Sequence, residues 1–423
     1  MADADSESEL IDLTDLRIGH FVYIDLGWLS HPFPLNAFRI RTQDQIDTIR
    51  ALGLQRIRYS AEKSELVIGS GLGASVSTSD VDPVESIRLA RQEALSEQRA
   101  SLKLCERHFN EASRSYRQIT DAYSNQPDTV RLLTEQLVGA VVEKLMCEQE
   151  SSIRLLSEQI GEKSSLHSIN VTVISLLLAK AMSLDAERMH DIGVGALLHD
   201  IGKLDLPNRL RWRDEYFSSS ELLLYHEHVG HGVSAGRRFG VSPGALLVIA
   251  QHHELADGSG YPQHLLGDKI SFASRIVGLV NHYDNLCNPA NPASGITPHE
   301  ALALMFAQQK ARFDGMVLSA FIRMMGVYPP GSVVQLNDDR FALVVSVNSN
   351  RPLKPQVVIH QPEIPRDEAL VVDLESTPEL TIRRSLKPVQ LPRAAMSYLS
   401  PRERICYFFE RAKIATPGDL AGS

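Results

Sequence analysis

The sequence is organised around one short stretch, Leu198-His199-Asp200-Ile201-Gly202-Lys203, which follows an apolar run. An imidazole and a carboxylate that are adjacent on a helix can bind neighbouring divalent metals, and the carboxylate can bridge them. The lysine, three residues after the aspartate, can reach an anion held at such a site. Read alone, the pair is weak support for a metal site, so the rest of the chain must supply further ligands.

Further histidines follow this pair, and eight of the fifteen in the chain fall between His199 and His282. Downstream come His228, the run His252-His253-Glu254 and the glycine-rich run Asp257-Gly258-Ser259-Gly260-Tyr261-Pro262. Neutral imidazoles together with carboxylates suit first-row divalent ions. The number and order of these residues therefore predict a metal site.

A second histidine–aspartate pair, His190-Asp191, lies nine residues before His199. Because each helical residue turns by about 100°, nine steps place the two pairs on opposite faces of one helix. The pair His199-Asp200 follows an apolar run and is followed by Lys203, whereas His190 has polar neighbours. We therefore expect His199 and Asp200 to be ligands and His190 to be exposed.

Composition excludes several classes of protein. The formal charge of -9 over 423 residues argues against a general nucleic-acid binder, so no DNA partner is expected. Four cysteines without metal-ligand spacing favour reduced thiols and the cytoplasm. The N-terminus is acidic, unlike a signal peptide, and the most apolar stretch, 171–182, is interrupted by Lys180 and too short to span a bilayer. No membrane partner is expected.

The pattern of apolar residues predicts a multidomain, mainly α protein in four parts. Strand-like segments at 16–24 and 55–59 flank a helix at 42–53, which indicates a small α+β domain with a docking, sensory or structural role. A Ser- and Gly-rich linker is expected at 63–82. The predicted boundaries are 1–65 for the α+β domain, 66–128 for the linker and connecting helix, 129–327 for an all-helical core, and 328–423 for a β-containing segment and tail.

Two helices outside the core are also expected. Charged and small residues dominate between Pro83 and Tyr123, as in an exposed helix that either connects domains in solvent or forms a homodimer. The tail is punctuated by prolines up to a helix expected at 401–412, and offers no chemistry.

Residues 164–286 resemble the HD-GYP branch of the HD phosphohydrolase superfamily, whose members are helical, metal-dependent phosphodiesterases that open the bacterial second messenger cyclic di-GMP. The stretches that carry the resemblance are Leu166-His167-Ser168, His199 to Lys203 followed by Leu206-Pro207, His228 with Gly232, His252 to Pro262, and Ser274-Arg275-Ile276-Val277. The N-terminal α+β unit and the β segment after Tyr328-Pro329-Pro330-Gly331 resemble parts that accompany this module in some proteobacterial members.

The resemblance implies a site with two divalent ions, iron or manganese. The metal ligands would be His167, His199 and Asp200 for one ion and His228, His252 and His253 for the other, with Asp200 bridging. Lys203 would stabilise charge on the phosphoryl oxygens, although a surface ion pair is its alternative role. A loop beside the site would be formed by Gly258, Gly260, Tyr261 and Pro262, and Tyr261 would offer its ring and hydroxyl to a guanine or a protein partner. The alternative is that these residues form a turn without a binding role.

Three positions depart from the family pattern. A final aspartate ligand is usual where this chain has Asn281, whose amide brings no negative charge, so the first metal should bind more weakly. Asp284 is expected to be a structural aspartate. An Arg-Pro-Tyr segment is replaced by Asn288-Pro289-Ala290, so another cation, Arg275 or Arg209, must hold the substrate. Lys163 stands where some members place a glutamate for a third metal, with Glu162 one residue out of phase, which predicts two metals at most.

The function expected from this resemblance is hydrolysis of cyclic di-GMP to pGpG, with GMP as a further candidate product, in bacterial signal transduction. A non-catalytic alternative is a cyclic di-GMP receptor or a module that binds diguanylate cyclases through the Gly-Tyr-Pro loop. A third alternative is hydrolysis of another nucleotide phosphoester.

Overall fold

A computed structural model describes residues 9–25, 37–40, 42–52, 54–61, 63–64, 83–147, 150–157, 163–212, 216–348 and 351–412. The chain divides into two compact units, residues 1–93 and 94–423, which are described separately below. The predicted linker at 63–82 lies, from residue 65 onward, outside the described residues.

The first unit contains an antiparallel sheet of four strands in the order β1-β4-β2-β3 with one helix, α1. Their bounds are Glu9–Asp12 for β1, Phe21–Tyr23 for β2, Ala37–Arg39 for β3, Gln43–Ala51 for α1 and Arg56–Ser60 for β4. Thr42 caps α1 in a reciprocal capping box with Gln45. Buried apolar side chains of α1 and the sheet, including Ile46, Ile49 and Ile57, form a separate small core. The predicted α+β domain is confirmed.

The long helix α2, Pro83–Ala122, corrects the expectation of an exposed or solvated helix. Within the second unit its apolar face is buried in the main core through Cys105, Phe109, Ala112, Tyr116 and Ile119. These residues recur every three or four positions, as on one face of a helix. The apolar face was thus present in the sequence, but it is narrower than the charged surface around it.

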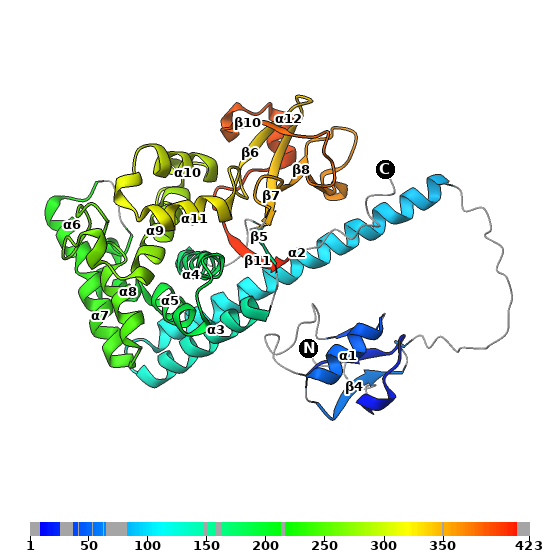
Figure 1. Cartoon of the computed structure of the whole chain (residues 1–423), viewed down its shortest axis with the longest axis horizontal. Helices are drawn as coiled ribbons and strands as arrows, with labels where there is room; N and C mark the ends of the chain where they lie inside the picture. The colour runs from blue at the N-terminus through cyan, green and yellow to red at the C-terminus, as the bar shows by residue number, and fades with distance from the viewer. Residues whose placement is uncertain are drawn as a thin grey trace. The chain divides into compact units, whose positions relative to one another are not determined.

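The main core is helical, as predicted. Its helices are α3 Pro127–Cys147, α4 Lys163–Ala181, α5 Ala186–Leu198, α6 Ser219–His226, α7 His228–Phe239, α8 Pro243–Gln251, α9 Phe272–Cys287, α10 Pro298–Ala307 and α11 Gly315–Met325. Helix α4 is buried along most of its length and packs against α3, α5, α9 and α11; it is drawn nearly end-on in Figure 1. No helix in the described part of the chain combines the length and apolarity needed to cross a membrane.

A seven-stranded antiparallel sheet completes the second unit (Figure 1). Its strands are β5 Ser151–Leu155, β6 Val333–Leu336, β7 Phe341–Asn348, β8 Gln356–Ile359, β9 Val371–Asp373, β10 Ile382–Leu386 and β11 Tyr407–Arg411, with the short helix α12 at Arg393–Leu399. The main path is β10-β6-β7-β5-β11, and β8 and β9 extend from β7.

Two strands correct the sequence analysis. The segment 401–412, expected to be a helix, contains β11, and β5 interrupts the region expected to be wholly helical. The two strands pair with each other, and nearly every side chain in both is buried. A short apolar run that is covered on both faces has no alternating pattern, so its residues alone do not separate a strand from a buried helix.

The contact between β11 and α2 predicts a loss of stability. The Phe408 ring is 1% exposed and lies edge-on to the ring of Phe109, with centroids 6.5 Å apart. We expect Phe408→Ala to lower the free energy of unfolding by about 3–5 kcal/mol, because the cavity left by a buried ring is only partly refilled. Val389→Ala, at a side chain 87% exposed in the same C-terminal segment, is the matched control. Chemical denaturation would measure both, and a loss below about 1 kcal/mol for Phe408→Ala would contradict this packing.

Candidate metal centre

His199 and Asp200 lie at the C-terminal end of α5, in the interior of the helical core. The preceding residues, 194–198, are all buried, so the helix carries the pair inward. The His199 side chain is 0% exposed and that of Asp200 is 10% exposed. The chain then continues as a single 3-10 turn, Ile201–Asp205.

The Asp200 carboxylate lies between two sets of histidines. Its Oδ2 atom is 3.6 Å from His167 Nε2 and 3.5 Å from His199 Nε2. Its Oδ1 atom is 3.5 Å from His228 Nε2 and 3.8 Å from His252 Nε2. In each set, the first with Asp200, His167 and His199 and the second with Asp200, His228, His252 and His253, all potential ligand atoms lie within 4.8 Å of one another. One carboxylate thus faces both sets.

Hydrogen bonds at Nδ1 turn the opposite nitrogen of each ring toward this carboxylate. The Nδ1 atoms of three histidines donate to the carbonyl three residues earlier: His199 to Ala196 at 2.6 Å, His228 to Tyr225 at 2.5 Å and His252 to Ile249 at 2.8 Å. A histidine that donates from Nδ1 presents an unprotonated Nε2, which is the tautomer that ligates metals. The rings are therefore held in ligating orientation by the backbone.

Two buried polar atoms at the centre have no hydrogen-bond partner among the described residues, Asp200 Oδ1 and His253 Nε2. A buried acceptor without a partner costs free energy, more so when it is charged. A divalent cation bound by imidazoles and carboxylate would satisfy both atoms. The residues present therefore fit the metal ions that the sequence analysis expects.

Charge and burial set the protonation states that metal binding requires. Burial lowers the pKa of His228 to about 4 and lowers the pKa values of His252 and His253 well below the usual range. Burial would raise the pKa of Asp200, but the Lys203 ammonium and the neighbouring imidazoles outweigh it and hold that pKa well below its ordinary value. At neutral pH the second set thus offers neutral imidazoles at His228, His252 and His253 beside an ionised Asp200 carboxylate, which are the forms that bind a cation.

Lys203 adds a fixed positive charge at the edge of the centre. Its Nζ atom donates to Asp200 Oδ2 at 2.5 Å and lies 5.2 Å from the centroid of the Tyr225 ring. Burial alone would lower the pKa of Lys203, but the Asp200 carboxylate raises it above its ordinary value. The lysine therefore stays protonated beside the carboxylate and remains available to an anion in the cavity.

Gly202 is required for the two histidine sets to meet. A Cβ atom at this position would lie 2.1 Å from the carbonyl oxygen of His228 and 2.3 Å from the backbone nitrogen of Gly232. Any larger residue would push α7 away from the 3-10 turn, and His228 would move with it. The sequence contained this glycine, but only the fold explains it.

The loop 257–262 supports the second histidine set from behind. The Tyr261 ring stacks on His253 with centroids 4.5 Å apart and on His226 with centroids 3.6 Å apart. A Cβ atom at Gly260 would lie 2.5 Å from the His253 carbonyl oxygen, so this residue must be glycine. The buried Glu254 carboxylate holds the chain beyond the loop by accepting from the backbone nitrogens of residues 263 and 265. The stacking partner His226 was not foreseen from the sequence.

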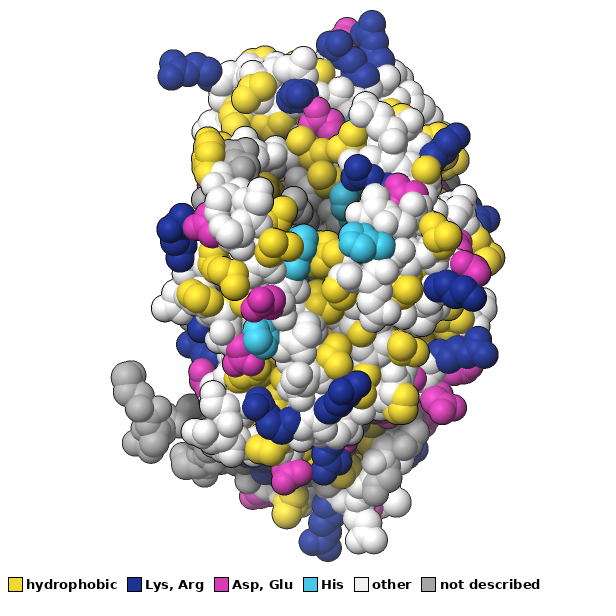
Figure 2. All heavy atoms as spheres, turned by 90° about the vertical axis from the view of Figure 1, so that its left-hand side faces the viewer, with side chains coloured by type: hydrophobic (Ala, Val, Ile, Leu, Met, Phe, Trp, Pro, Cys, Tyr) yellow, Lys and Arg dark blue, Asp and Glu magenta, His cyan; other side chains and the backbone are white. Residues whose placement is uncertain are grey.

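A cavity of about 1320 Å³ opens over the centre. Its lining includes Lys203, Tyr261, Asn281 and part of each histidine set, namely His167, Asp200, His252 and His253, whereas His199, His228, Gly258 and Pro262 are not part of it. Figure 2 shows the hollowed face, with histidine side chains at the edge of the hollow. The cavity is wide enough for a ligand larger than a drug-sized molecule, for which sites of about 300–1,000 Å³ are usual.

Comparison with known proteins agrees with this geometry. Residues 141–317 match the HD domain family, residues 333–394 match a KOW domain associated with HD domains, and residues 9–129 match a family described as a domain of unknown function. This chain therefore contains an HD domain. Its HD domain thus coincides with the helical part that holds both histidine sets.

Several curated proteins are similar in sequence to this chain. The cyclic di-GMP phosphodiesterase PA4108 of Pseudomonas aeruginosa is 29% identical over 82% of this chain and 84% of that protein. The cyclic di-GMP phosphodiesterase response regulator RpfG of Xanthomonas campestris is 32% identical over 35% of this chain and 39% of that protein. The 3'3'-cGAMP-specific phosphodiesterase 1 of Vibrio cholerae is 27% identical over 46% of each chain. The similarity thus extends over most of the first relative and less than half of the other two.

Helix α9 carries Asn281, which stands where the family resemblance places a final aspartate ligand. Asn281 is buried and lines the cavity, and its Oδ1 atom accepts from Asn285 Nδ2 at 2.8 Å. One turn later Asp284 Oδ2 accepts from His167 Nδ1 at 2.6 Å, so this carboxylate orients the His167 ring. The structural role expected for Asp284 is confirmed. Glu162 and the Lys163 side chain lie outside what the structure describes.

Arg275 does not serve the role suggested for it. Its guanidinium pairs with Asp314 at 2.9 Å and donates to the carbonyl of Ile270, and it is not part of the cavity lining. Arg209 lines the cavity but pairs with Glu221 at 2.7 Å. His190, of the second histidine–aspartate pair, is only partly exposed on α5 and is not part of the cavity lining. The neighbouring Asp191 accepts a hydrogen bond from Ser242.

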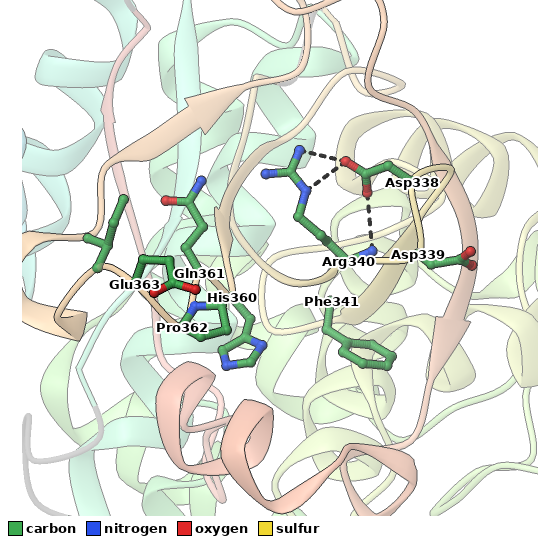
Figure 3. A pocket seen from close by; sticks show the side chains of 9 residues that line it. Asp338, Asp339, Arg340, Phe341, His360, Gln361, Pro362 and Glu363 are labelled. Carbon is green, nitrogen blue, oxygen red and sulfur yellow. Dashed lines mark hydrogen bonds and ion pairs between the residues drawn. The ribbon is translucent and has the colours of Figure 1, made fainter.

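A second, smaller hollow of about 560 Å³ lies on the C-terminal sheet, between residues 338–341 and 360–364 (Figure 3). Arg340 and Asp338 point toward each other there and form an ion pair at 2.6 Å. His360 is its single histidine, and neither potential metal group found among the described residues includes it. Both potential metal groups found among the described residues therefore lie at the first cavity.

Metal content tests the shared carboxylate. We expect two ions per purified chain, one for each set, measured by inductively coupled plasma mass spectrometry. His167→Ala should lose one ion, and Asp200→Ala should lose most of both, because its two oxygens face both sets. His190→Ala, on the same helix but outside the cavity, should keep both. Two ions retained by Asp200→Ala would show that this residue does not bridge.

Proposed function

We propose that this chain hydrolyses cyclic di-GMP to linear pGpG, with GMP as a further product, in bacterial signal transduction. One observation carries the proposal: a single buried carboxylate, Asp200, faces two histidine sets at the base of a large cavity. The relative that matches most of this chain is named a cyclic di-GMP phosphodiesterase, which favours this substrate over other cyclic dinucleotides.

The chain's own residues would bind and orient the substrate around two ions, iron or manganese. His167 and His199 with Asp200 would hold one ion, and His228, His252 and His253 with Asp200 the other, with Asn281 an additional oxygen ligand near the first. When bound, such a pair of ions lowers the pKa of water and stabilises charge on phosphoryl oxygens. Lys203, buried and protonated beside Asp200, would hold one of those oxygens in place.

The proposal also covers the cellular location, the domain division and the partners of this chain. The four cysteines form no disulfide, which supports a cytoplasmic protein. We also propose the four-part division at residues 65, 128 and 327, with the loop 257–262 as the surface that would contact a diguanylate cyclase. A homodimer through α2 is limited to the part of that helix that does not enter the core.

Asn281 favours a second candidate function. Its amide adds no negative charge to the first set, and its oxygen already accepts a hydrogen bond from Asn285. Metal bound by His167, His199 and Asp200 would then have one anionic ligand, which it shares with the other ion. A chain whose first ion dissociates readily would bind cyclic di-GMP as a receptor, or act as a docking module, without cutting it.

Turnover assays separate these functions. Protein loaded with manganese or ferrous iron under reducing conditions should hydrolyse cyclic di-GMP faster than 3'3'-cGAMP. Chromatography of the products would measure both rates. Asn281→Asp should raise metal affinity by about 10–100-fold, because a carboxylate replaces an amide at the first set. The double variant His199→Ala/Asp200→Ala should lose at least about a hundredfold in kcat, while His190→Ala stays active.

Other outcomes would reject the proposal. An inert native chain that becomes active with Asn281→Asp would establish the receptor function instead. Turnover that survives the loss of His199 and Asp200 would show that the reaction occurs at another site.

A further inference from the structure

The C-terminal segment reaches the cavity of the HD domain. Arg404, in the loop between α12 and β11, is part of the cavity lining, although it lies beyond residues 141–317 that match the HD family. We propose that Arg404 is a substrate-binding residue that grips a phosphate of the cyclic dinucleotide. This inference rests on the proposed function, since it concerns how that substrate is held.

The backbone beside Arg404 is fixed to the HD domain by hydrogen bonds. Ile405 donates its N–H to Asn288 Oδ1 at 2.8 Å, and its carbonyl accepts from Asn288 Nδ2 and Asn170 Nδ2, both at 2.8 Å. Tyr407, the first residue of β11, donates its N–H to Asn170 Oδ1 at 3.0 Å. Two asparagine side chains, one on α4 and one at the end of α9, thus replace backbone partners for the incoming segment.

The same asparagines connect this anchor to the metal centre. Asn170 and Asn288 also donate to Asp284 Oδ1, at 2.9 and 3.0 Å, while Asp284 Oδ2 accepts from His167 Nδ1 at 2.6 Å. Only Asp284 and one asparagine therefore separate His167 from the backbone of Ile405. Arg404 is held at a defined position relative to the first histidine set.

Three other cations of the lining already have partners. Lys203 donates to Asp200, Arg209 pairs with Glu221, and Arg211 donates to the carbonyls of residues 204 and 206. Arg312 is exposed and lies close enough to Asp257 to lower the pKa of that carboxyl, after the effects of burial and of the Ser259 hydrogen bonds. Among the described residues, no hydrogen bond or ion pair engages the guanidinium of Arg404, which is half-buried.

The chemistry of the substrate requires a second cation. A cyclic dinucleotide carries two phosphodiesters, and the metal centre with Lys203 can hold only the one that is cut. A guanidinium binds a phosphate through two parallel hydrogen bonds, and a half-buried one does so against weaker competition from water. Arg404 offers this group at the rim of the same cavity, so it would set affinity more than the rate of bond cleavage.

Substitution of Arg404 tests the inference by kinetics and by binding. The variants are Arg404→Ala and Arg404→Lys, with Arg393→Ala as control, because Arg393 is an exposed arginine of the same segment outside the lining. KM and kcat would be measured for cyclic di-GMP with manganese, and Kd by calorimetry for cyclic di-GMP in EDTA, where turnover stops. Metal content would be measured for each variant.

Arg404→Ala should raise KM and Kd by about tenfold or more, with kcat within about threefold and metal content unchanged, because a charge-assisted hydrogen bond is lost. Arg404→Lys should recover part of the affinity, and Arg393→Ala should match the native chain. Unchanged KM and Kd in Arg404→Ala, or loss of bound metal in that variant, would overturn the inference and leave the proposed function intact.

A native chain that binds cyclic di-GMP without cutting it would reject the proposed function alone. The ratio of the Kd values of Arg404→Ala and the native chain would still test the role of Arg404. A native chain that neither binds nor cuts it would reject both.

Discussion

The Asp200 carboxylate, buried between the Nε2 atoms of two histidine sets, is the interaction on which the rest of the site depends. A buried charge is stable only when its surroundings compensate the loss of water. Here Lys203 neutralises one oxygen at 2.5 Å, while the other oxygen lacks a hydrogen-bond partner among the described residues. The carboxylate is thus held ready for a cation rather than saturated by the protein. The contact of Gly202 with α7 keeps the second set within its reach.

The supports of this centre extend well beyond the HD domain. The His167 ring depends on Asp284, and Asp284 shares its asparagine partners with the backbone of β11. Strand β11 in turn pairs with β5, which comes from the region between α3 and α4. The C-terminal sheet is therefore part of the architecture that places the first histidine set, and not an independent appendage. A cavity lined by residues of the HD domain and of the C-terminal segment can bind one ligand with side chains from each.

The sequence predicted those features that depend on local pattern. The helical core followed from apolar spacing, and a metal site followed from the density of histidines. The division of those histidines into two sets followed only from the family resemblance, which rests on motifs within short stretches. Strands β5 and β11 were missed because their pairing joins residues about 250 positions apart and their buried faces carry no alternation. Arg275 was a wrong choice because Asp314, which neutralises it, lies 39 residues away. Arg404 was overlooked for the same reason, since only the docking on Asn170 and Asn288 brings it to the cavity.

Anomalous X-ray diffraction from crystals grown with manganese tests the central claim most directly. The account predicts two anomalous peaks on opposite sides of the Asp200 carboxylate, one next to His167 and His199 and one among His228, His252 and His253. A single peak, or two peaks that both lie on one side of that carboxylate, would contradict the role of Asp200 as the shared ligand.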